Sequence, residues 1–304
     1  MYHNPVMPSE SIDSLNIVKD GVYVDLTFGG GGHSRLILEN LGKNGKLIAF
    51  DQDKDAMKNN IDDTRFMLIN QNFKFLKQNL KYNSIDNVDG VFADLGVSSH
   101  QFDSSQRGFS IRYDSELDMR MNTNTLVDAK KILNEYSEDQ LSNIFFQYSD
   151  LRNSKQIAKA IINYRSEKTI FKTSHLNELL EPFLPQGFKN KVLAKVYQAL
   201  RIEVNQEMEV LKEVLSQLPE LVKKGGVISI ITYHSVEDRL VKRFIQNGCF
   251  ESEPIKNKFG VSKTPFKKVF KFLTPSEGEI KINNRARSAK LRSAVRIWKI
   301  NLKK

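Results

Sequence analysis

The 304-residue chain lacks several features that would place it outside the cytosol. Its one cysteine, Cys249, excludes an intramolecular disulfide framework and any multi-cysteine metal site. No apolar run approaches the ~18 residues that a membrane-spanning helix needs. The opening residues MYHNPVMPSES show neither the basic nor the apolar segment of a secretory signal. We therefore expect a cytoplasmic protein without membrane contact, and no motif indicates a metal site.

Positive charge is concentrated at one end of the chain. Residues 255–304 hold 15 of the 46 Lys and Arg residues but only two of the 36 acidic ones, so this segment carries +13 and the rest −3. A charge block of this kind is often a solvated tail. Here, however, it is interleaved with aromatic residues, which are Phe259, Phe266, Phe270, Phe272 and Trp298. We expect the segment to bind a polyanion.

Short β-rich runs alternate with helical patterns in the first hundred residues. Strands are predicted over 21–26, 45–50, 65–70 and 88–95, with a helix over 33–41. Strands separated by single helices form right-handed βαβ units in a parallel sheet. The fold class is therefore α/β, with a Rossmann-like sheet.

A helical, strand-poor stretch from about 126 to 181 interrupts this pattern. Within it, Ser137 and Gln140 fit a capping box, and an amphipathic helical pattern follows over 191–218. A strand pattern returns at 225–232. We predict one α/β domain, residues 1–103 and 196–304, interrupted by a helical substrate-recognition domain at 104–195.

The segment from Asp25 to His33 reads DLTFGGGGH and joins a strand to a helix. Glycines allow positive φ and close approach of the backbone to a ligand, and N–H groups point outward at the helix N-terminus. Asp51 ends the next strand, 22 residues after Gly29, where an acid accepts hydrogen bonds from ribose hydroxyls. Loop and acid together predict a cofactor that contains adenosine.

The spacing of the glycines distinguishes two cofactor classes. A nicotinamide-binding loop reads GxGxxG, but Ser34 stands where the third glycine belongs. The spacing Asp25-x-x-x-Gly29-x-Gly31 resembles instead the first motif of S-adenosylmethionine-dependent methyltransferases, with Thr27 where glycine is common.

Two further candidates follow strands. Asp94 ends the fourth strand, where the ligand crevice of an open α/β sheet lies, and packing does not require an acid there. His234 follows the 225–232 strand and either positions a substrate base, relays a proton, or only packs. In the last case Ser235, with Asp238, caps the next helix.

Eight segments carry a resemblance to one known family. They are TFGGGGHSRLIL (27–38), AFDQD (49–53), ADLGVSSHQFD (93–103), RGFS (107–110), LDMRMN (117–122), YQALRIEVN (197–205), YHSVEDRLVKRF (233–244) and RARSAKLR (285–292). In this order they resemble the RsmH (MraW) family of ribosomal RNA small-subunit methyltransferases. DLGVSS, LDMRM and HS-x-EDR are far more specific than a glycine loop.

The resemblance implies the reaction and its site. Members of the family transfer a methyl group from S-adenosylmethionine to N4 of a cytidine, at the customary position 1402, in 16S rRNA of the small ribosomal subunit. Carried over by position, the cofactor contacts are Gly31, Gly32, His33, Asp51, Phe73, Asp94 and Gln101. Phe73 otherwise packs in the core. Asp94 either accepts a proton from the substrate amine or orients the cofactor, and the chain is a monomer or a homodimer.

The RNA-binding residues come from the basic end of the chain. Arg285, Arg287, Lys290 and Arg292 form its densest cluster and suit phosphate contacts. An unpaired or extruded cytosine is expected to stack on an aromatic such as Phe109 or Tyr233.

The sequence departs from the family's pattern at 148–151, at 190–195 and at Asn283-Asn284, all outside the cofactor site. Two other classes remain. A non-catalytic RNA-binding protein leaves Asp51 and Asp94 without a purpose. A nicotinamide-dependent oxidoreductase explains neither Ser34 nor the basic end.

Overall fold

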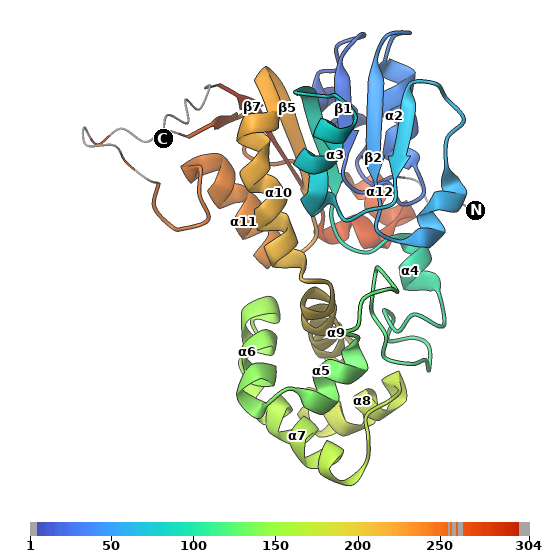
Figure 1. Cartoon of the computed structure of the whole chain (residues 1–304). Helices are drawn as coiled ribbons and strands as arrows, with labels where there is room; N and C mark the ends of the chain where they lie inside the picture. Colours follow the sequence, from blue (N-terminus) through green and yellow to red (C-terminus); the bar gives the residue numbers. More distant parts are fainter. Residues whose placement is uncertain (1–4, 255, 257–259, 261–263, 298–304) are drawn as a thin grey trace. The chain divides into compact units, whose positions relative to one another are not determined.

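The computed structural model describes residues 5–254, 256, 260 and 264–297 (Figure 1). The chain divides into two compact units, residues 1–96 with 209–304 and residues 97–208. The boundaries lie outside the predicted ones at 103/104 and 195/196. The reason is visible at the second boundary, because α9 (Lys189–Asn205) is one continuous helix that a division at 195 would cut.

One seven-stranded sheet lies in the first unit, in the order β3-β2-β1-β4-β5-β7-β6. Its strands are β1 (Val22–Asp25), β2 (Lys46–Phe50), β3 (Phe66–Ile69), β4 (Val88–Asp94), β5 (Val222–Thr232), β6 (Phe266–Lys268) and β7 (Lys290–Arg296). β1 to β5 are parallel, and β7 is antiparallel to both β5 and β6. The Rossmann-like α/β class is confirmed, with β6 and β7 as strands that the sequence patterns did not predict.

The strand order reverses between β1 and β4. The chain runs from β1 outward to β2 and β3, and then returns to place β4 on the other side of β1. In open α/β sheets this switch point is where ligands bind, beyond the carboxyl ends of the strands. Asp25 and Asp94 end β1 and β4, and Asp51 follows β2, so three carboxyl groups meet this edge.

Helices cover both faces of the sheet. The helices of this unit are α1 (Pro8–Leu15), α2 (Gly32–Asn40), α3 (Leu76–Tyr82), α10 (Glu207–Leu221), α11 (Ser235–Asn247) and α12 (Glu277–Ile282). Leu291 of β7 and Ile231 of β5 share a core with α1 and α2. Side chains alternate along a strand, so Arg292 points to the opposite face, where it binds Asp238 of α11.

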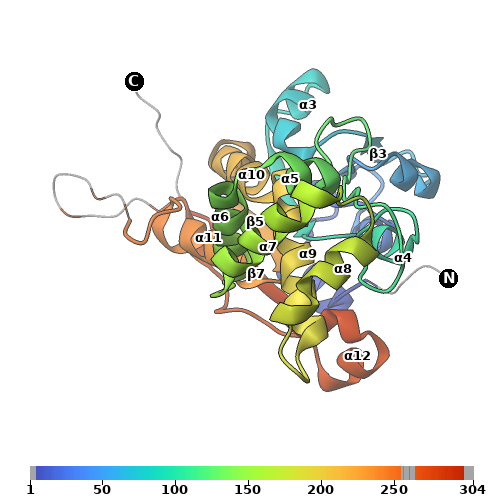
Figure 2. The ribbon, with the colours of Figure 1, turned by 90° about the horizontal axis from the view of Figure 1, so that it is seen from below.

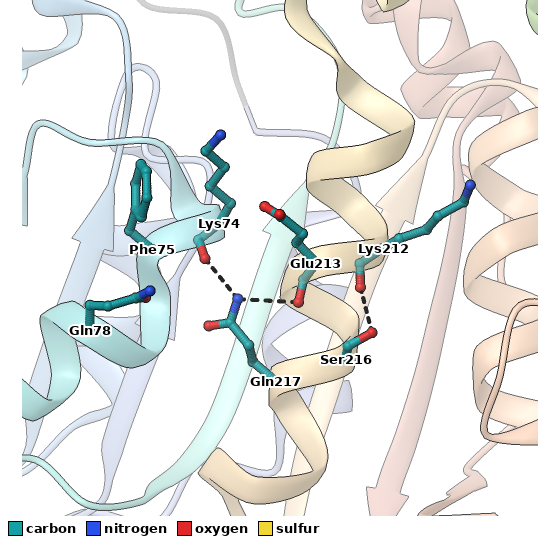
Figure 3. A pocket seen from close by; sticks show the side chains of 7 residues that line it. All are labelled: Lys74, Phe75, Gln78, Lys212, Glu213, Ser216 and Gln217. Carbon is teal, nitrogen blue, oxygen red and sulfur yellow. Dashed lines mark hydrogen bonds between the residues drawn. The ribbon is translucent and has the colours of Figure 1, made fainter.

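A glutamine side chain joins α10 to α3. The Gln217 amide donates to the Lys74 carbonyl (2.7 Å) and to the Glu213 carbonyl of its own helix (3.1 Å), as Figure 3 shows. Its Oε1 accepts from the Lys77 N–H (2.9 Å), and the Lys77 ammonium lies 2.7 Å from Glu220. These contacts fix the segment that follows β3 to α10.

The second unit is helical. It contains α4 (Ser99–Asp103), α5 (Ala129–Glu135), α6 (Glu138–Ser149), α7 (Ser154–Glu167), α8 (Thr173–Leu180) and α9. α6 packs beside α7 and α9 around buried residues such as Phe145 and Leu200 (Figure 2). The capping box of Ser137 and Gln140 is confirmed. None of the helices in the described ranges is long and apolar enough to cross a membrane.

The amphipathic pattern over 191–218 belongs to two helices. α9 ends at Asn205, the capping residue Gln206 has φ 51° and ψ 39°, and α10 begins at Glu207. The apolar spacing continues through this break, so periodicity alone predicted one helix. The break at Gln206 lies just before the boundary between the two units, which falls after Met208.

Candidate active site

The loop between β1 and α2 brings backbone N–H groups to the carboxyl edge of the sheet. α2 begins at Gly32, and Gly31 before it has φ 77°. A Cβ at Gly31 would lie 2.9 Å from the Phe28 ring, so both the backbone and the available space require glycine. The first N–H groups of a helix have no partner within it. The loop therefore suits a polar ligand at the start of α2.

Asp25 holds this loop from beneath. Its carboxylate is buried and accepts from the Ser34 hydroxyl (2.6 Å) and from the Thr27 N–H (3.0 Å). Burial raises the pKa of Asp25, and these two hydrogen bonds lower it. Asp25 is part of the glycine motif but was not predicted as a site residue. Its position at the end of β1 could have identified it from the sequence.

Asp51 fixes the glycine loop to β2. Its Oδ2 accepts from the Gly29 N–H and its Oδ1 from the Asp53 N–H, each at 2.8 Å. Burial raises the pKa of Asp51 to about 6, and the two hydrogen bonds oppose that effect. A carboxylate offers about four acceptor positions. Two donors therefore leave Asp51 able to accept further hydrogen bonds, as a ribose would require.

Asp94 is held by two side-chain hydroxyls. The Tyr233 hydroxyl donates to Asp94 Oδ1 (2.7 Å), and the Asp94 N–H donates to Thr27 Oγ1 (2.6 Å). Burial raises the pKa of Asp94 to about 7, and the hydrogen bond from Tyr233 opposes this rise. Thr27, a departure from the glycine that is common there, thus ties the loop after β1 to the end of β4.

His33 connects the chain's first described residues with this site. Its Nε2 lies 2.9 Å from the Val6 carbonyl oxygen and donates to it, which leaves Nδ1 without a proton in the neutral ring. Nδ1 lies 3.8 Å from Asp94 Oδ2, and the ring packs on Phe92 at 4.5 Å between centroids. Burial lowers the pKa of His33, so the ring is neutral at physiological pH.

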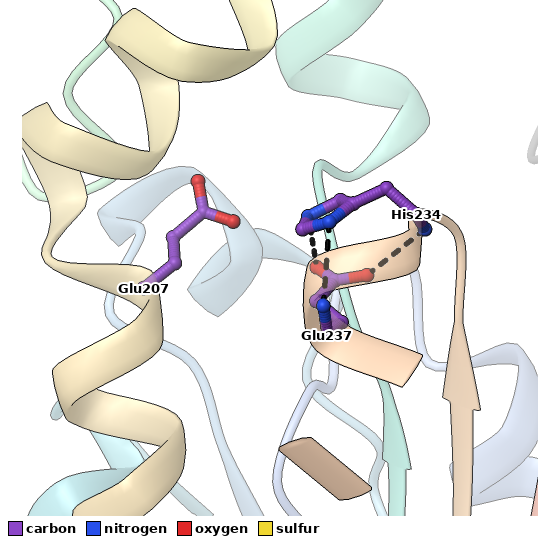
Figure 4. Close-up of side chains that lie close together, drawn as sticks. All are labelled: Glu207, His234 and Glu237. Carbon is purple, nitrogen blue, oxygen red and sulfur yellow. Dashed lines mark hydrogen bonds and ion pairs between the residues drawn. The ribbon is translucent and has the colours of Figure 1, made fainter. Parts of the chain in front are cut away.

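His234 is the residue that caps α11. Its Nδ1 accepts from the Glu237 N–H (3.4 Å), while Glu237 Oε2 accepts from the Tyr233 N–H (3.0 Å) and the His234 N–H (3.4 Å) (Figure 4). The prediction that Ser235 caps this helix with Asp238 was therefore wrong by one residue. Glu237 is buried, and its Oε1 lies 2.9 Å from His234 Nε2. His234 thus caps α11 through Nδ1, whereas its buried Nε2 makes no hydrogen bond within the described residues, and a chemical role for His234 stays a prediction.

Residues 1–297 match the MraW methylase family. This chain belongs to that family. Ribosomal RNA small subunit methyltransferase H of Christiangramia forsetii is 56% identical over 293 residues, covering 96% of this chain and 97% of that protein. The protein of the same name from Flavobacterium johnsoniae is 55% identical over 296 residues, 97% of this chain and 98% of its own length. The predicted family is thereby confirmed.

A crystal structure of an rRNA methylase from Streptococcus thermophilus aligns with this MraW methylase over 96% of this chain and 97% of its own. The identity is 12% and the TM-score is 0.44, too distant to bear on the site. The family assignment therefore rests on sequence, and the arrangement of the site on the contacts described above. Both favour a methyltransferase over an oxidoreductase.

Three other predicted residues lie in different parts of the chain: one is in the first unit and two are in the second. Phe73 is half-buried at the start of a short 3₁₀ segment that follows β3. Gln101 belongs to the second unit, where it is buried and forms a capping box with Ser98 at the start of α4. Cofactor contacts by Phe73 and Gln101 stay predictions. Phe109 is 6% exposed within the core of the helical unit, so it offers no face to a base and that expectation was wrong.

The basic end of the methylase is divided between two elements. Arg285 and Arg287 lie in a 3₁₀ helix over Asn284–Ser288, whereas Lys290 and Arg292 lie in β7. The Arg292 guanidinium donates to Asp238 from Nε (2.6 Å) and Nη2 (3.1 Å), and to the Lys271 carbonyl from Nη1 (2.9 Å). Three of its five N–H groups are used and the residue is 9% exposed, so a phosphate contact by Arg292 stays a prediction. Phe259 and Trp298 lie outside the described residues.

Proposed function

We propose that this protein transfers a methyl group from S-adenosylmethionine to N4 of a cytidine in 16S rRNA, at customary position 1402. It is a member of a methylase family, and its relatives are named ribosomal RNA small subunit methyltransferases. The structural observation that carries the proposal is Asp94, a half-buried carboxyl with a pKa near 7 at the switch-point edge of the sheet.

The cofactor is S-adenosylmethionine, and the residues at the edge fit it. The Gly31 N–H donates to the Phe28 carbonyl, so the donors on offer begin with the first turn of α2 at Gly32, and Asp51 retains acceptor capacity for ribose hydroxyls. No pyrophosphate has to be bound, so acids beside the loop are compatible with this ligand. When bound, the cofactor supplies a methyl group on a sulfonium, with a neutral leaving group. Asp51 and the glycine loop hold it at the ends of β1 and β2.

Asp94 has the chemistry that the substrate amine needs. The exocyclic nitrogen of cytosine is a weak nucleophile, because its lone pair is delocalised into the ring. An acceptor for one amine hydrogen increases the charge on nitrogen in the transition state. With a pKa of about 7, the Asp94 carboxyl is substantially ionised at neutral pH and serves as that acceptor. Tyr233 positions the carboxylate through its hydroxyl.

The alternative role of Asp94 is to orient the cofactor only. The two roles differ in what substitution by Asn does: loss of an orienting contact weakens cofactor binding, whereas loss of a proton acceptor slows turnover at saturation. In this mechanism the Nδ1 of His234 caps α11, and no step is assigned to its Nε2.

The product of the reaction tests the proposal. Small ribosomal subunits that lack the modification are incubated with the protein and labelled S-adenosylmethionine, and the RNA is then digested to nucleosides. We expect the label in N4-methylcytidine. Label in another nucleoside, or in none although the cofactor binds, contradicts the assignment. Naked 16S rRNA, tested in parallel, shows whether the assembled subunit is required.

A further inference from the structure

A basic hollow lies beside the edge that carries Asp94, between α11 and the β6–β7 hairpin. It has a volume of about 390 Å³. Its cationic lining residues are Lys242 of α11, Lys268 of β6, Lys271, and Lys290 and Arg292 of β7. These residues span 50 positions of the sequence, from Lys242 to Arg292, so the fold brings them together and the motif at 285–292 alone does not form the hollow.

The charge of this hollow is not neutralised by the protein. Asp238 is the one acidic residue among its described lining residues; both its carboxylate oxygens bind the Arg292 guanidinium, and its Oδ2 also lies 3.5 Å from the Lys290 ammonium. Within residues 5–254, 256, 260 and 264–297, no carboxylate lies within ion-pair distance of the ammonium groups of Lys242, Lys268 and Lys271. Arg292 and Asp238 cancel, so the hollow keeps the charge of its four lysines.

Three of the cationic side chains lie close to the ring of Phe272. The charged groups of Lys271, Lys290 and Arg292 lie 5.7, 5.6 and 5.4 Å from the centroid of its ring. Each cation is attracted to the face of the ring. Like charges at this spacing nevertheless repel one another. An arrangement of this kind is stabilised by an anion bound among the lysines.

The position of the hollow indicates which anion. Lys290 pairs with Thr232 at the carboxyl end of β5, directly before Tyr233. In the same edge of the sheet, Asp94 pairs with Ile231, which pairs with Leu291. β7 is thus two strands from β4, a separation of about 10 Å. These lysines are therefore within reach of the phosphates that flank a nucleotide at Asp94.

We propose that this hollow binds the phosphodiester backbone of the substrate RNA next to the target nucleotide. The proposal rests on the function proposed above and adds a specific anchoring site to it. Lys242, Lys268, Lys271 and Lys290 contact phosphates, and Arg292 acts through Asp238 to keep the only acid of the hollow neutralised. Contacts of this type are independent of sequence and depend on salt.

The test compares two variants with equal loss of charge. The first is Lys242→Ala/Lys268→Ala/Lys271→Ala, which leaves Lys290 and Arg292 in place. The matched control is Lys43→Ala/Lys46→Ala/Lys81→Ala, three exposed lysines away from the hollow. The affinity of the full chain for a fluorescein-labelled single-stranded RNA is measured by anisotropy over a series of salt concentrations. Binding of S-adenosylmethionine and methyl transfer to small subunits are measured for both variants.

Each lost phosphate contact to a single strand lowers the slope of log affinity against log salt by about 0.7, so the hollow variant is expected to lose about 2 units of slope. The control is expected to keep the slope of the unaltered protein. Equal slopes in the two variants overturn the proposal, as does a hollow variant that loses affinity for polyglutamate but not for RNA. The two proposals can fail separately. If only the hollow variant shows a smaller slope of log affinity against log salt, and the unaltered protein transfers no methyl group to small subunits, then the proposed function fails and the anchoring site stands.

Discussion

The bond between Tyr233 and Asp94 makes a prediction about the pH dependence of turnover. Replacing Tyr233 by Phe removes the hydroxyl that donates to Asp94 Oδ1 at 2.7 Å. A hydrogen bond to an ionised acceptor contributes roughly 1.5–3 kcal/mol, and one pKa unit corresponds to about 1.4 kcal/mol. Since this hydrogen bond lowers the pKa of Asp94, its loss raises that pKa from about 7 by roughly one to two units.

The sign of the effect follows from the active form of the carboxyl. Ionised Asp94 accepts the proton, so a higher pKa reduces the active fraction at neutral pH. The acid limb of the profile of turnover against pH moves to higher pH by roughly one to two units. At pH 7.5, turnover falls by about 3- to 25-fold, and it recovers once the pH exceeds the new pKa.

The assay is methyl transfer to small subunits at saturating cofactor and RNA across pH 6–10. Tyr23→Phe is the matched control, because it removes a buried hydroxyl that accepts from the Val18 N–H (2.8 Å) in β1, away from Asp94. The control is expected to lose stability and keep the pH profile. An acid limb that does not move in Tyr233→Phe would refute the coupling between Tyr233 and Asp94.

Three further predictions concern stability and binding. Asp94 has a pKa of about 7 in the folded protein against a usual value of 3.8, so the folded protein loses stability as the pH rises from 3.8 to 7. Asp94→Asn avoids this loss, and denaturant titration is expected to show a free energy of unfolding about 2–4 kcal/mol higher than that of the unaltered protein at pH 8. The difference is expected to vanish near pH 4. Gly31→Ala and the control Gly225→Ala both place alanine at positive φ, but only at Gly31 would the new Cβ meet a side chain, the Phe28 ring. Calorimetry is expected to show at least about tenfold weaker cofactor binding for Gly31→Ala and unchanged binding for the control. Arg292→Ala leaves the Asp238 carboxylate without its main partner, and it is expected to lower the free energy of unfolding by about 3 kcal/mol. Lys290→Ala is expected to lower it by less than about 1 kcal/mol, and equal losses would contradict a structural role for Arg292.

Much of the fold was predictable because strand and helix periods are local. The runs at 21–26, 45–50, 65–70 and 88–95 are largely apolar, each has a polar residue within one position of its last residue, and each contains an observed strand. β7 was not predicted, since its sequence KLRSAVR carries three cations. Arg292 and Arg296 are buried only because Asp238 and the carbonyls of α10 and Pro265 bind them. Partners this distant in sequence leave no local pattern.

Some residues of the candidate site could also be predicted from the sequence, and others could not. Asp51 and Asp94 were identified because a strand end can be recognised from sequence, and the sheet brings strand ends to one edge. The bond from Tyr233 joins residues 139 positions apart, and it depends on the adjacency of β4 and β5. The capping residue of α11 was missed by one position, since both Ser235 and His234 have side chains that accept a hydrogen bond from a helix N–H.

The most direct test of the central claim is single-turnover methyl transfer by the unaltered protein and by Asp94→Asn, at saturating S-adenosylmethionine, with the labelled nucleoside identified. The account predicts label in N4-methylcytidine at a rate that falls at least about 100-fold in Asp94→Asn, while the affinity for the cofactor changes little. An unchanged rate at saturation, with weakened cofactor binding, would contradict the role of Asp94 as proton acceptor; label in a different nucleoside would contradict the reaction itself.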